Sequence, residues 1–460
     1  MKGLLTYRFK YFVLITSISF LHMSCSLFDD DEPGIPAPAS CSPEDYNQYV
    51  YDVMKRFYYW YDQVDPTNQI DPKDTIAYPT PQTLVEALRY SPLDRFSGIS
   101  DASTFNQFYG EGKFLGYGLR FVTDEITENL MVAYPLTGSS AYTNGVQRGD
   151  RIVEINGYSA NGLSGDDWKA AWGPDEAGAT AELLVHPAGD PAQETTITLT
   201  KSLVTINTTQ YSSVIDAGAN NVGYLHFTNF LGSTAIEQLK SKFSEFTQNN
   251  INQLIVDLRY NGGGSVTTAR LLGSLIGGEK TADSLFTKLI FNNKPDGYAG
   301  YSESFNFLSE VSNSLNLNRV VFITTSDSCS ASELLMNSFI PTTEMEVVVI
   351  GSTSCGKPVG FKPQSHCGKS LSFVNFEIKN AANQGGYFDG ISAGYSGLGA
   401  FCDAEDDITS PLGDSNESSV ASALSYIENG QCSAIKRKSG MRLKSGSGSN
   451  SQYSIMENIY

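Results

Sequence analysis

Hydrophobic positions follow different patterns in the two halves of the chain, and the second half has the more regular one. A strand is predicted there at 221–230, and apolar runs typical of strands buried in a parallel sheet follow within 251–264, 318–327 and 345–352. Four segments with helical spacing of apolar residues alternate with them, at 233–246, 267–278, 331–340 and 417–430. This alternation predicts an α/β core over residues 204–433.

The first half is predicted to hold two smaller units. Residues 43–108 place aromatic and apolar side chains near helical spacing, which predicts a helical segment whose aromatic residues pack between helices. A ligand-binding aromatic cluster is the less favoured alternative. Residues 109–203 are rich in glycine turns and include the alternating run ETTITLT, which predicts a β-rich domain.

One stretch of this β-rich domain has a specific pattern, SSAYTNGVQRGDRIVEING at 139–157. It resembles a PDZ domain in its small first residues, in Gly145, in Gly149-Asp150 and in its final IVEING. PDZ domains bind chain ends by strand addition and hold the terminal carboxylate on backbone N–H groups. YGLRF stands where that carboxylate loop lies, which assigns Gly118, Leu119 and Arg120 to the loop. The alternative is that Gly118 only serves a turn.

The chain begins with a pattern typical of an export signal. Basic residues precede the apolar run 11–20, which is too short to span a bilayer. LHMSC ends at Cys25 and resembles a lipoprotein signal box, which implies a signal peptide over 1–24 and lipidation of Cys25. A plain cleaved secretion signal is the alternative. Residues 25–42 are acidic and then proline-rich, which predicts an extended tether.

These features predict an exported protein, held by its lipid anchor in the cell envelope of a Gram-negative bacterium, at the outer membrane or in the periplasm. The acid-rich residues after Cys25 resemble surface-export signals of some Gram-negative lipoproteins. At the other end, residues 434–460 are basic and then rich in glycine and serine, which predicts a disordered tail.

Composition narrows the classes of partner. A net charge of −19 argues against nucleic acid, because phosphate binding needs clustered cations. The 4 histidines form no ligand cluster and no CxxC pair occurs, so neither a metal nor a cofactor is predicted. Apart from Cys25, an exported chain permits disulfides among its cysteines, although the sequence does not reveal their pairing. No oligomeric state is predicted.

Ser330 follows a predicted strand and precedes the predicted helix 331–340. A serine at such a turn lies beside the unpaired N–H groups of the helix start, which favour a developing oxyanion. Lys357 lies in the loop after the next predicted strand, and parallel strands joined by one helix bring both loops to the same sheet edge. Taken alone, Ser330 would be interpreted as a helix cap, as Ser332 and Glu333 are, so the lysine decides the interpretation.

This combination resembles the C-terminal processing peptidases, also called tail-specific proteases. Their nucleophile precedes ASE and their base lies in a GK after the next strand, which match Ser330 and Lys357. Their DLRxNxGG turn is matched by Asp257, Leu258, Arg259, Asn261, Gly263 and Gly264. The order of helical segment, PDZ domain and core also matches, from residue 43 to about 432. The resemblance implies a parallel-sheet, ClpP/crotonase-like core and a serine endopeptidase acting on protein or peptide substrates.

The resemblance also implies a Ser–Lys dyad, with Ser330 as nucleophile and Lys357 as base. Near neutral pH, an uncharged lysine needs a drop of about 3 units from its reference pKa of about 10.4, which burial beside apolar atoms supplies. The N–H of Ala331 or Ser330 and a glycine N–H would hold the oxyanion. Family members often carry proline, which has no N–H, where this chain has Gly262, so Gly263 is the predicted donor.

One position departs from the family. A glutamine or glutamate commonly follows the lysine by four residues, and Phe361 stands there in this chain. Gln364 or His366 could take that role through a longer loop, so the third catalytic residue stays unassigned. Cys329 and Cys355 flank the dyad, and they are predicted either to form a disulfide or to be two small buried residues.

Two other functions are weighed against the peptidase. A non-catalytic peptide- or ligand-binding lipoprotein on the same fold is one, because retinoid-binding modules related to the family have lost proteolysis and Phe361 breaks the pattern. The presence of both Ser330 and Lys357 favours the peptidase, since a binding protein needs neither. A Ser–His hydrolase is disfavoured, because His226 and His366 are the only histidines in the predicted core.

Overall fold

The computed structural model describes residues 37–190, 192–433, 441 and 443–445. The predicted signal peptide (1–24), the predicted lipidation site Cys25 and most of the tether lie outside these residues. Within them, no helix combines the length and the apolar character needed to cross a membrane. Disulfides pair the six cysteines that follow Cys25, as Cys41–Cys367, Cys329–Cys355 and Cys402–Cys432.

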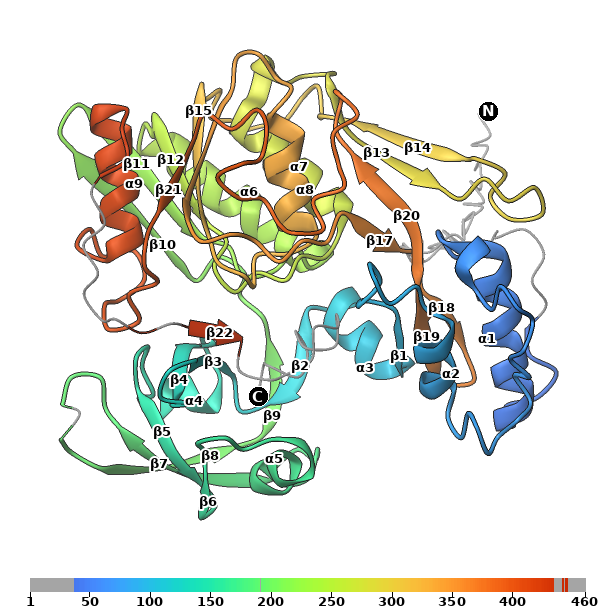
Figure 1. The fold of residues 1–460 in the computed structure, drawn as a ribbon. Helices are drawn as coiled ribbons and strands as arrows, with labels where there is room; N and C mark the ends of the chain where they lie inside the picture. Colours follow the sequence, from blue (N-terminus) through green and yellow to red (C-terminus); the bar gives the residue numbers. More distant parts are fainter. Residues whose placement is uncertain (1–36, 191, 434–440, 442, 446–460) are drawn as a thin grey trace, which may run out of the picture. The chain divides into compact units, whose positions relative to one another are not determined.

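The predicted α/β core is built on a six-stranded sheet (Figure 1). Its strands lie in the order β10, β11, β12, β15, β16 and β21, and every neighbouring pair is parallel except β10–β11. The four predicted strands form the four inner strands of this sheet. The bounds are β10 Tyr211–Ala217, β11 Asn220–His226, β12 Gln253–Asp257, β15 Arg319–Thr324, β16 Glu346–Gly351 and β21 Ala400–Asp403.

Helices cover both faces of this sheet, which explains why its inner strands are apolar throughout. Along β16, Val347 and Val349 belong to one core cluster, and Val348 and Ile350 belong to another, because successive side chains point to opposite faces. The first cluster includes residues of α6 (Ser233–Gln248), α7 (Val266–Gly277) and α8 (Ala331–Phe339). The second includes residues of α9 (Ser418–Asn429).

The N-terminal segment contains α1 (Pro43–Phe57) and α2 (Pro81–Leu88), and its aromatic residues are buried, as predicted. This segment was predicted to be helical, but it also contains a strand, because β1 (Gly98–Asp101) pairs antiparallel with β19 (Lys369–Ser372). Such a distant partner leaves no local pattern. The sheets here are β1–β19–β18 and β14–β13–β20–β17. Their other strands are β18 Gln364–His366, β13 Leu285–Phe291, β14 Ser302–Asn306, β20 Val374–Lys379 and β17 Val359–Phe361.

The residues predicted to form a β-rich domain contribute six strands of a seven-stranded sheet, whose order is β22, β3, β4, β5, β7 and β8, with β6 paired to β5. The chain enters and leaves through paired strands, β2 (Lys113–Gly116) and β9 (Ser202–Thr205). The assignment of this unit as a PDZ domain stays a prediction. Its bounds are β3 Leu119–Asp124, β4 Leu130–Pro135, α4 Ser140–Thr143, β5 Arg151–Ile155, β6 Tyr158–Ser159, α5 Gly165–Trp172, β7 Thr180–His186 and β8 Thr195–Thr200.

The outermost strand of that sheet comes from the tail that was predicted to be disordered. β22 (Leu443–Ser445) pairs antiparallel with β3. The prediction of disorder is therefore wrong for these residues, and the rest of 434–460 apart from Met441 lies outside the described part of the chain. Short helical turns complete the structure, at α3 Ala102–Phe105, η1 Tyr61–Gln63, η2 Asn106–Gly110 and η3 Gly278–Lys280.

Candidate active site

The predicted dyad residues follow adjacent parallel strands. β15 and β16 pair with Thr324 opposite Gly351 at their carboxyl ends. The turn after β15 leads through Ser330 into α8, and the loop after β16 carries Lys357. Both residues therefore leave the same edge of the sheet, as the strand–helix–strand order predicts.

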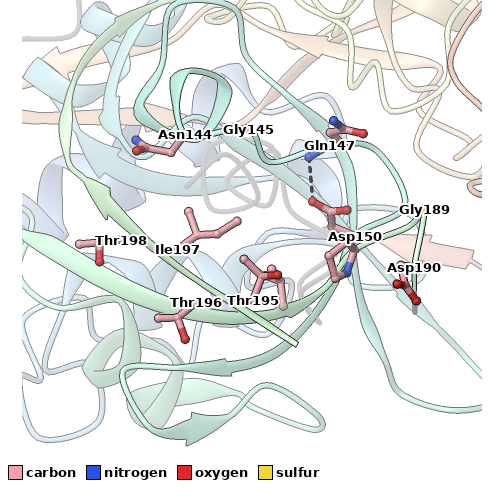
Figure 2. Close-up of a pocket in the computed structure, with 12 residues that line it drawn as sticks. Asn144, Gly145, Gln147, Asp150, Gly189, Asp190, Thr195, Thr196, Ile197 and Thr198 are labelled. Atoms are coloured by element: carbon pink, nitrogen blue, oxygen red, sulfur yellow. Dashed lines mark hydrogen bonds between the residues drawn. The ribbon is translucent and has the colours of Figure 1, made fainter. Parts of the chain in front are cut away.

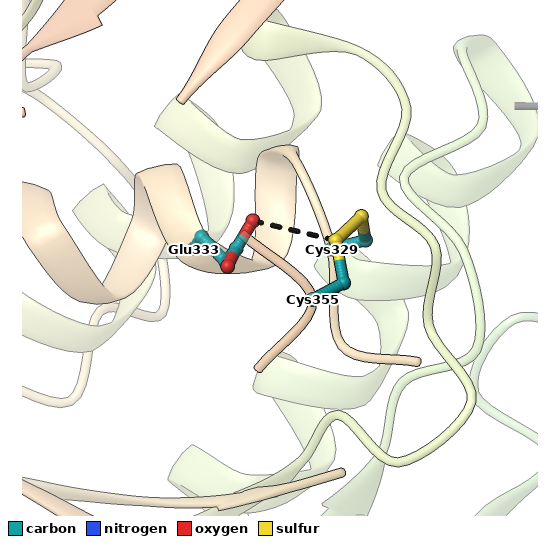
Figure 3. Close-up of side chains that lie close together, drawn as sticks. All are labelled: Cys329, Glu333 and Cys355. Atoms are coloured by element: carbon teal, nitrogen blue, oxygen red, sulfur yellow. Dashed lines mark hydrogen bonds between the residues drawn. A yellow bond between two sulfur atoms is a disulfide. The ribbon is translucent and has the colours of Figure 1, made fainter. Parts of the chain in front are cut away.

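A disulfide joins these two loops (Figure 3). Cys329, which precedes Ser330, is bonded to Cys355, and their Cα atoms lie 5.2 Å apart. The disulfide, one of the two predicted alternatives for this pair, is therefore confirmed. The Sγ of Cys355 lies 3.7 Å from Oε2 of Glu333, a contact without a hydrogen bond because a disulfide sulfur carries no proton. Cys329, Glu333 and Cys355 lie within the reach of one metal ion, but the bonded sulfurs offer no thiolate ligand.

Glu333 connects the same two loops through its buried carboxylate. One oxygen, Oε2, accepts hydrogen bonds from the backbone N–H of Ser330 at 2.9 Å and of Lys357 at 2.8 Å. The other, Oε1, accepts from the backbone N–H of Gly356 at 2.7 Å and from the hydroxyl of Ser354 at 2.6 Å. Burial raises the pKa of Glu333. A single carboxylate oxygen thus binds the backbones of both predicted dyad residues, which exceeds the capping role predicted for Glu333.

Ser330 has a strained backbone at its turn. Its φ of 54° lies in the left-handed region, which residues with a Cβ rarely adopt. The surrounding bonds hold this conformation, since Glu333 binds its N–H and its carbonyl oxygen accepts from the N–H of Leu334 at 2.8 Å. A strained strand-to-helix turn of this kind is typical of a nucleophile presented above a helix start.

The two predicted oxyanion donors lie beside Ser330. A Cβ placed on Gly263 would lie 2.7 Å from the Cβ of Ser330 and 2.9 Å from the nitrogen of Ala331, so no larger residue fits there. The φ of +103° at Gly263 also favours glycine. In this structure the Gly263 N–H donates to Oδ1 of Asn261 at 2.9 Å. That bond must break before Gly263 can donate to an oxyanion.

Lys357 is held in an apolar environment. The residue is 6% exposed. Its Nζ lies 4.1 Å from the ring centroid of Phe361 and 5.2 Å from that of Phe96. Burial lowers the pKa of Lys357 to about 7, against the opposing influence of the Asp94 and Glu333 carboxylates. Near neutral pH a substantial fraction of this amine is therefore uncharged and able to accept a proton.

The N-terminal segment supplies part of this environment, which no sequence pattern predicted. Arg95 donates from Nη2 to the carbonyl oxygens of Cys355 at 2.6 Å and Gly356 at 3.1 Å. Its charge also helps to lower the pKa of Lys357. Asp94 is buried and accepts a hydrogen bond from the hydroxyl of Tyr58 at 2.6 Å. The loop that carries Lys357 is thus held in place from outside the α/β core.

The structure does not place a polar partner at the position where the family has one. Phe361 lies directly beside the amine of Lys357. Of the two alternatives, Gln364 and His366, both lie on β18, and the ring of His366 packs against Tyr49 with centroids 4.8 Å apart. The carboxylates that influence the amine are Asp94 and Glu333 instead.

The DLR motif has a structural role. Arg259 is fully buried and pairs with Asp257 at 2.6 Å, Glu417 at 3.0 Å and Asp406 at 2.9 Å. These ion pairs join β12 to the start of α9. The adjacent His226 is also buried, lies 3.2 Å from the carbonyl oxygen of Arg259 through Nε2, and has a pKa lowered by burial to about 4.

The predicted carboxylate loop is connected to the turn that carries Ser330. Gly118 has a φ of +86° and packs so closely on Ser139 that a Cβ would lie 2.0 Å from the Cβ of that serine. Leu119 is buried at the start of β3. Arg120 forms an ion pair with Asp327 at 3.0 Å, and both side chains are largely buried. The β-rich domain therefore contacts the turn that carries Ser330 through a charged group.

A separate cavity of about 540 Å³ lies in the β-rich domain (Figure 2). Residues of the α4–β5 turn and of the β7–β8 hairpin line it. The carboxylate of Asp150 accepts hydrogen bonds within this wall, from the N–H of Gln147 at 2.8 Å and of Ala188 at 2.9 Å. Its described lining contains none of the predicted site residues, so we assign it no chemistry.

Two segments of the chain match known peptidases in sequence. Residues 221–390 match Peptidase family S41, and residues 45–98 match the Peptidase S41 N-terminal domain. The chain is similar to the chloroplastic C-terminal processing peptidase of Tetradesmus obliquus, 29% identical over 175 residues that cover 35% of this chain and 37% of that protein. It is also similar to the carboxy-terminal processing protease CtpA of Bacillus subtilis (strain 168), 24% identical over 184 residues that cover 40% and 37%. The alignments span little more than a third of these relatives.

A solved structure is similar over most of the chain. A Bacteroides fragilis NCTC 9343 protein assigned to the S41 proteases superposes with a TM-score of 0.66 and 22% identity, over 83% of this chain and 97% of that one. At this level of identity the similarity establishes the fold, including the N-terminal helical segment.

Proposed function

We propose that the chain, whose residues 221–390 and 45–98 match the S41 peptidase models, is a serine endopeptidase of this family acting on protein substrates. Ser330 is the nucleophile and Lys357 is its general base. The observation that carries the proposal is that Glu333 and the Cys329–Cys355 disulfide join the loops of Ser330 and Lys357 at one edge of the sheet. Ser330 has a strained backbone there, and the pKa of Lys357 is lowered to about 7.

The reaction follows from the protonation state of the amine. Uncharged Lys357 accepts the hydroxyl proton of Ser330 as the serine oxygen attacks a peptide carbonyl, and the resulting ammonium returns the proton to the leaving amine. The oxyanion of the tetrahedral intermediate is held by the N–H of Ala331 at the start of α8 and by the N–H of Gly263. Release of the Asn261–Gly263 hydrogen bond is then part of substrate binding.

The β-rich domain is proposed to act as a PDZ-type reader of substrate C-termini. Gly118, Leu119 and Arg120 hold the terminal carboxylate in this proposal, or gate the site. The Arg120–Asp327 ion pair supports a connection between this reader and the nucleophile turn, because Asp327 lies on the same turn as Ser330.

Export and lipid anchoring through Cys25 complete the proposal. Three disulfides support an oxidising compartment outside the cytosol. Metabolic labelling with a radioactive fatty acid tests the anchor: label on the wild type and none on a Cys25→Ala variant is the expected result.

The alternative is a non-catalytic binding protein on the same fold, which is favoured by Phe361 at the position of a polar partner. One comparison separates the two functions. Wild type and a Ser330→Ala variant are incubated with an unfolded protein substrate, and the fragments are identified by mass spectrometry. The proposal expects cleavage by the wild type alone. Cleavage by neither protein supports the binding function, and equal cleavage by both removes Ser330 as the nucleophile.

A further inference from the structure

The sheet of the β-rich domain ends with a strand from the chain's own tail (Figure 1). In the described sheet, β3 lies between β4 and β22, so β3 would be an edge strand without the tail. An edge strand presents a row of unpaired N–H and C=O groups to which another strand adds. β22 occupies this edge along residues 122–124.

The direction of β22 matches that of a ligand for the predicted carboxylate loop. Leu443 lies opposite Asp124 and Ser445 lies opposite Val122. The C-terminal end of β22 therefore lies nearer to Gly118 than its N-terminal end does. A peptide that places its terminal carboxylate at this loop while it adds to β3 must run in the same direction.

Apolar side chains reinforce the backbone pairing. Met441 and Leu443 are half-buried and pack against the core cluster that contains Val122 and Met131. The tail is thus held both by strand addition and by apolar contacts. Only a short strand is involved, so an incoming peptide can replace it.

We propose that Met441 and the strand Leu443–Ser445 are a built-in ligand that covers the docking edge of β3 until an extended peptide with a free C-terminus displaces it. The inference rests on the proposed role of this domain as a reader of chain ends. An occupied edge weakens the apparent affinity for added peptide, because only molecules with a vacant edge bind it.

Peptide affinity tests this directly, in a Ser330→Ala background that prevents cleavage. The probe is a fluorescein-labelled peptide of residues 441–448 with a free carboxylate, and binding is followed by fluorescence anisotropy. A chain ending at Gly440 is expected to bind the probe with a Kd about tenfold lower than the full chain, as follows if the tail is paired in about nine of ten molecules.

A matched pair of full-length variants separates strand pairing from tail length. Leu443→Pro removes an N–H and bends the strand, so it is expected to reproduce the gain of the shortened chain. Ser451→Pro lies outside β22 and is expected to leave the Kd unchanged. An equal gain in both variants would overturn the inference.

The remaining outcomes also distinguish this inference from the proposed function. Equal Kd values for the full and shortened chains would overturn self-occupation and leave the peptide reader intact. Failure of the probe to bind either chain would overturn self-occupation together with the peptide reader, and the cleavage comparison of Ser330→Ala with wild type would be unaffected.

Discussion

Replacement of Lys357 by methionine is expected to stabilise the folded protein while it abolishes cleavage. Methionine has a similar length and no charge, so it preserves the apolar contacts with Phe96 and Phe361. It removes the proposed proton acceptor for Ser330 at the same time. Stability and activity therefore change in opposite directions.

The size of the stabilisation follows from the pKa of Lys357, which burial lowers from 10.5 to about 7. Between these two pH values the unfolded chain binds the proton and the folded chain does not, so the stability of the wild type rises with pH across this window. At about 1.4 kcal/mol per pKa unit, the buried lysine costs about 4 kcal/mol at pH 7 and about 2 kcal/mol at pH 9. Lys357→Met removes this cost.

Urea unfolding followed by tryptophan fluorescence, at pH 7 and at pH 9, measures the effect. Lys362→Met is the matched control, because Lys362 lies nearby on the chain, is more exposed and pairs with Glu303. The control is expected to change the free energy of unfolding by less than about 1 kcal/mol, as for an exposed ion pair. A Lys357→Met variant that is destabilised, or whose effect is the same at both pH values, would refute an uncharged lysine in the folded state.

Three further variants test the connections around the site. Glu333→Gln exchanges one carboxylate oxygen for an N–H₂ group and leaves two donors unsatisfied, so we expect a loss of about 3 kcal/mol of stability. We also expect kcat to fall and KM to stay the same, and an unchanged kcat would show that Glu333 does not position the site. Cys329→Ser breaks the disulfide to Cys355 and is expected to lower the free energy of unfolding by about 3 kcal/mol. An unchanged midpoint in urea unfolding would contradict this expectation. Arg259→Met leaves buried Asp257 and Glu417 without their cation and is expected to lower the free energy of unfolding by about 3–5 kcal/mol. A change no larger than the experimental error would show that these ion pairs are dispensable for stability.

The sequence predicts the core of this fold because the relevant signals are local. Strands covered on both faces are apolar throughout, as in β12, β15 and β16. In the helices between them, apolar residues recur every three or four positions. The parallel order then brings the loops of Ser330 and Lys357 to one edge of the sheet. For this reason the sequence also offers the Cys329–Cys355 disulfide as one of two alternatives.

Contacts between distant segments carry no such signal. Asp94 and Arg95 reach the lysine loop from the N-terminal segment, and neither residue stands in a recognisable pattern around the site. Glu333 looks like an ordinary helix cap until the loop of Lys357 is placed against it. The strand β22 was missed because a tail rich in glycine and serine has the composition of a disordered segment, whereas the exposed edge of β3 supplies its pairing partner.

The pairing of Ser330 with an uncharged Lys357 is tested most directly by covalent labelling of the serine as a function of pH. An acylating β-lactone is added between pH 5 and pH 9, and the modified peptide is identified by mass spectrometry. We expect the adduct on Ser330, a labelling rate that rises through about pH 7 as Lys357 loses its proton, and no adduct in Lys357→Met. Labelling of Ser330 at a rate independent of pH, or equal labelling in Lys357→Met, would contradict the proposed dyad.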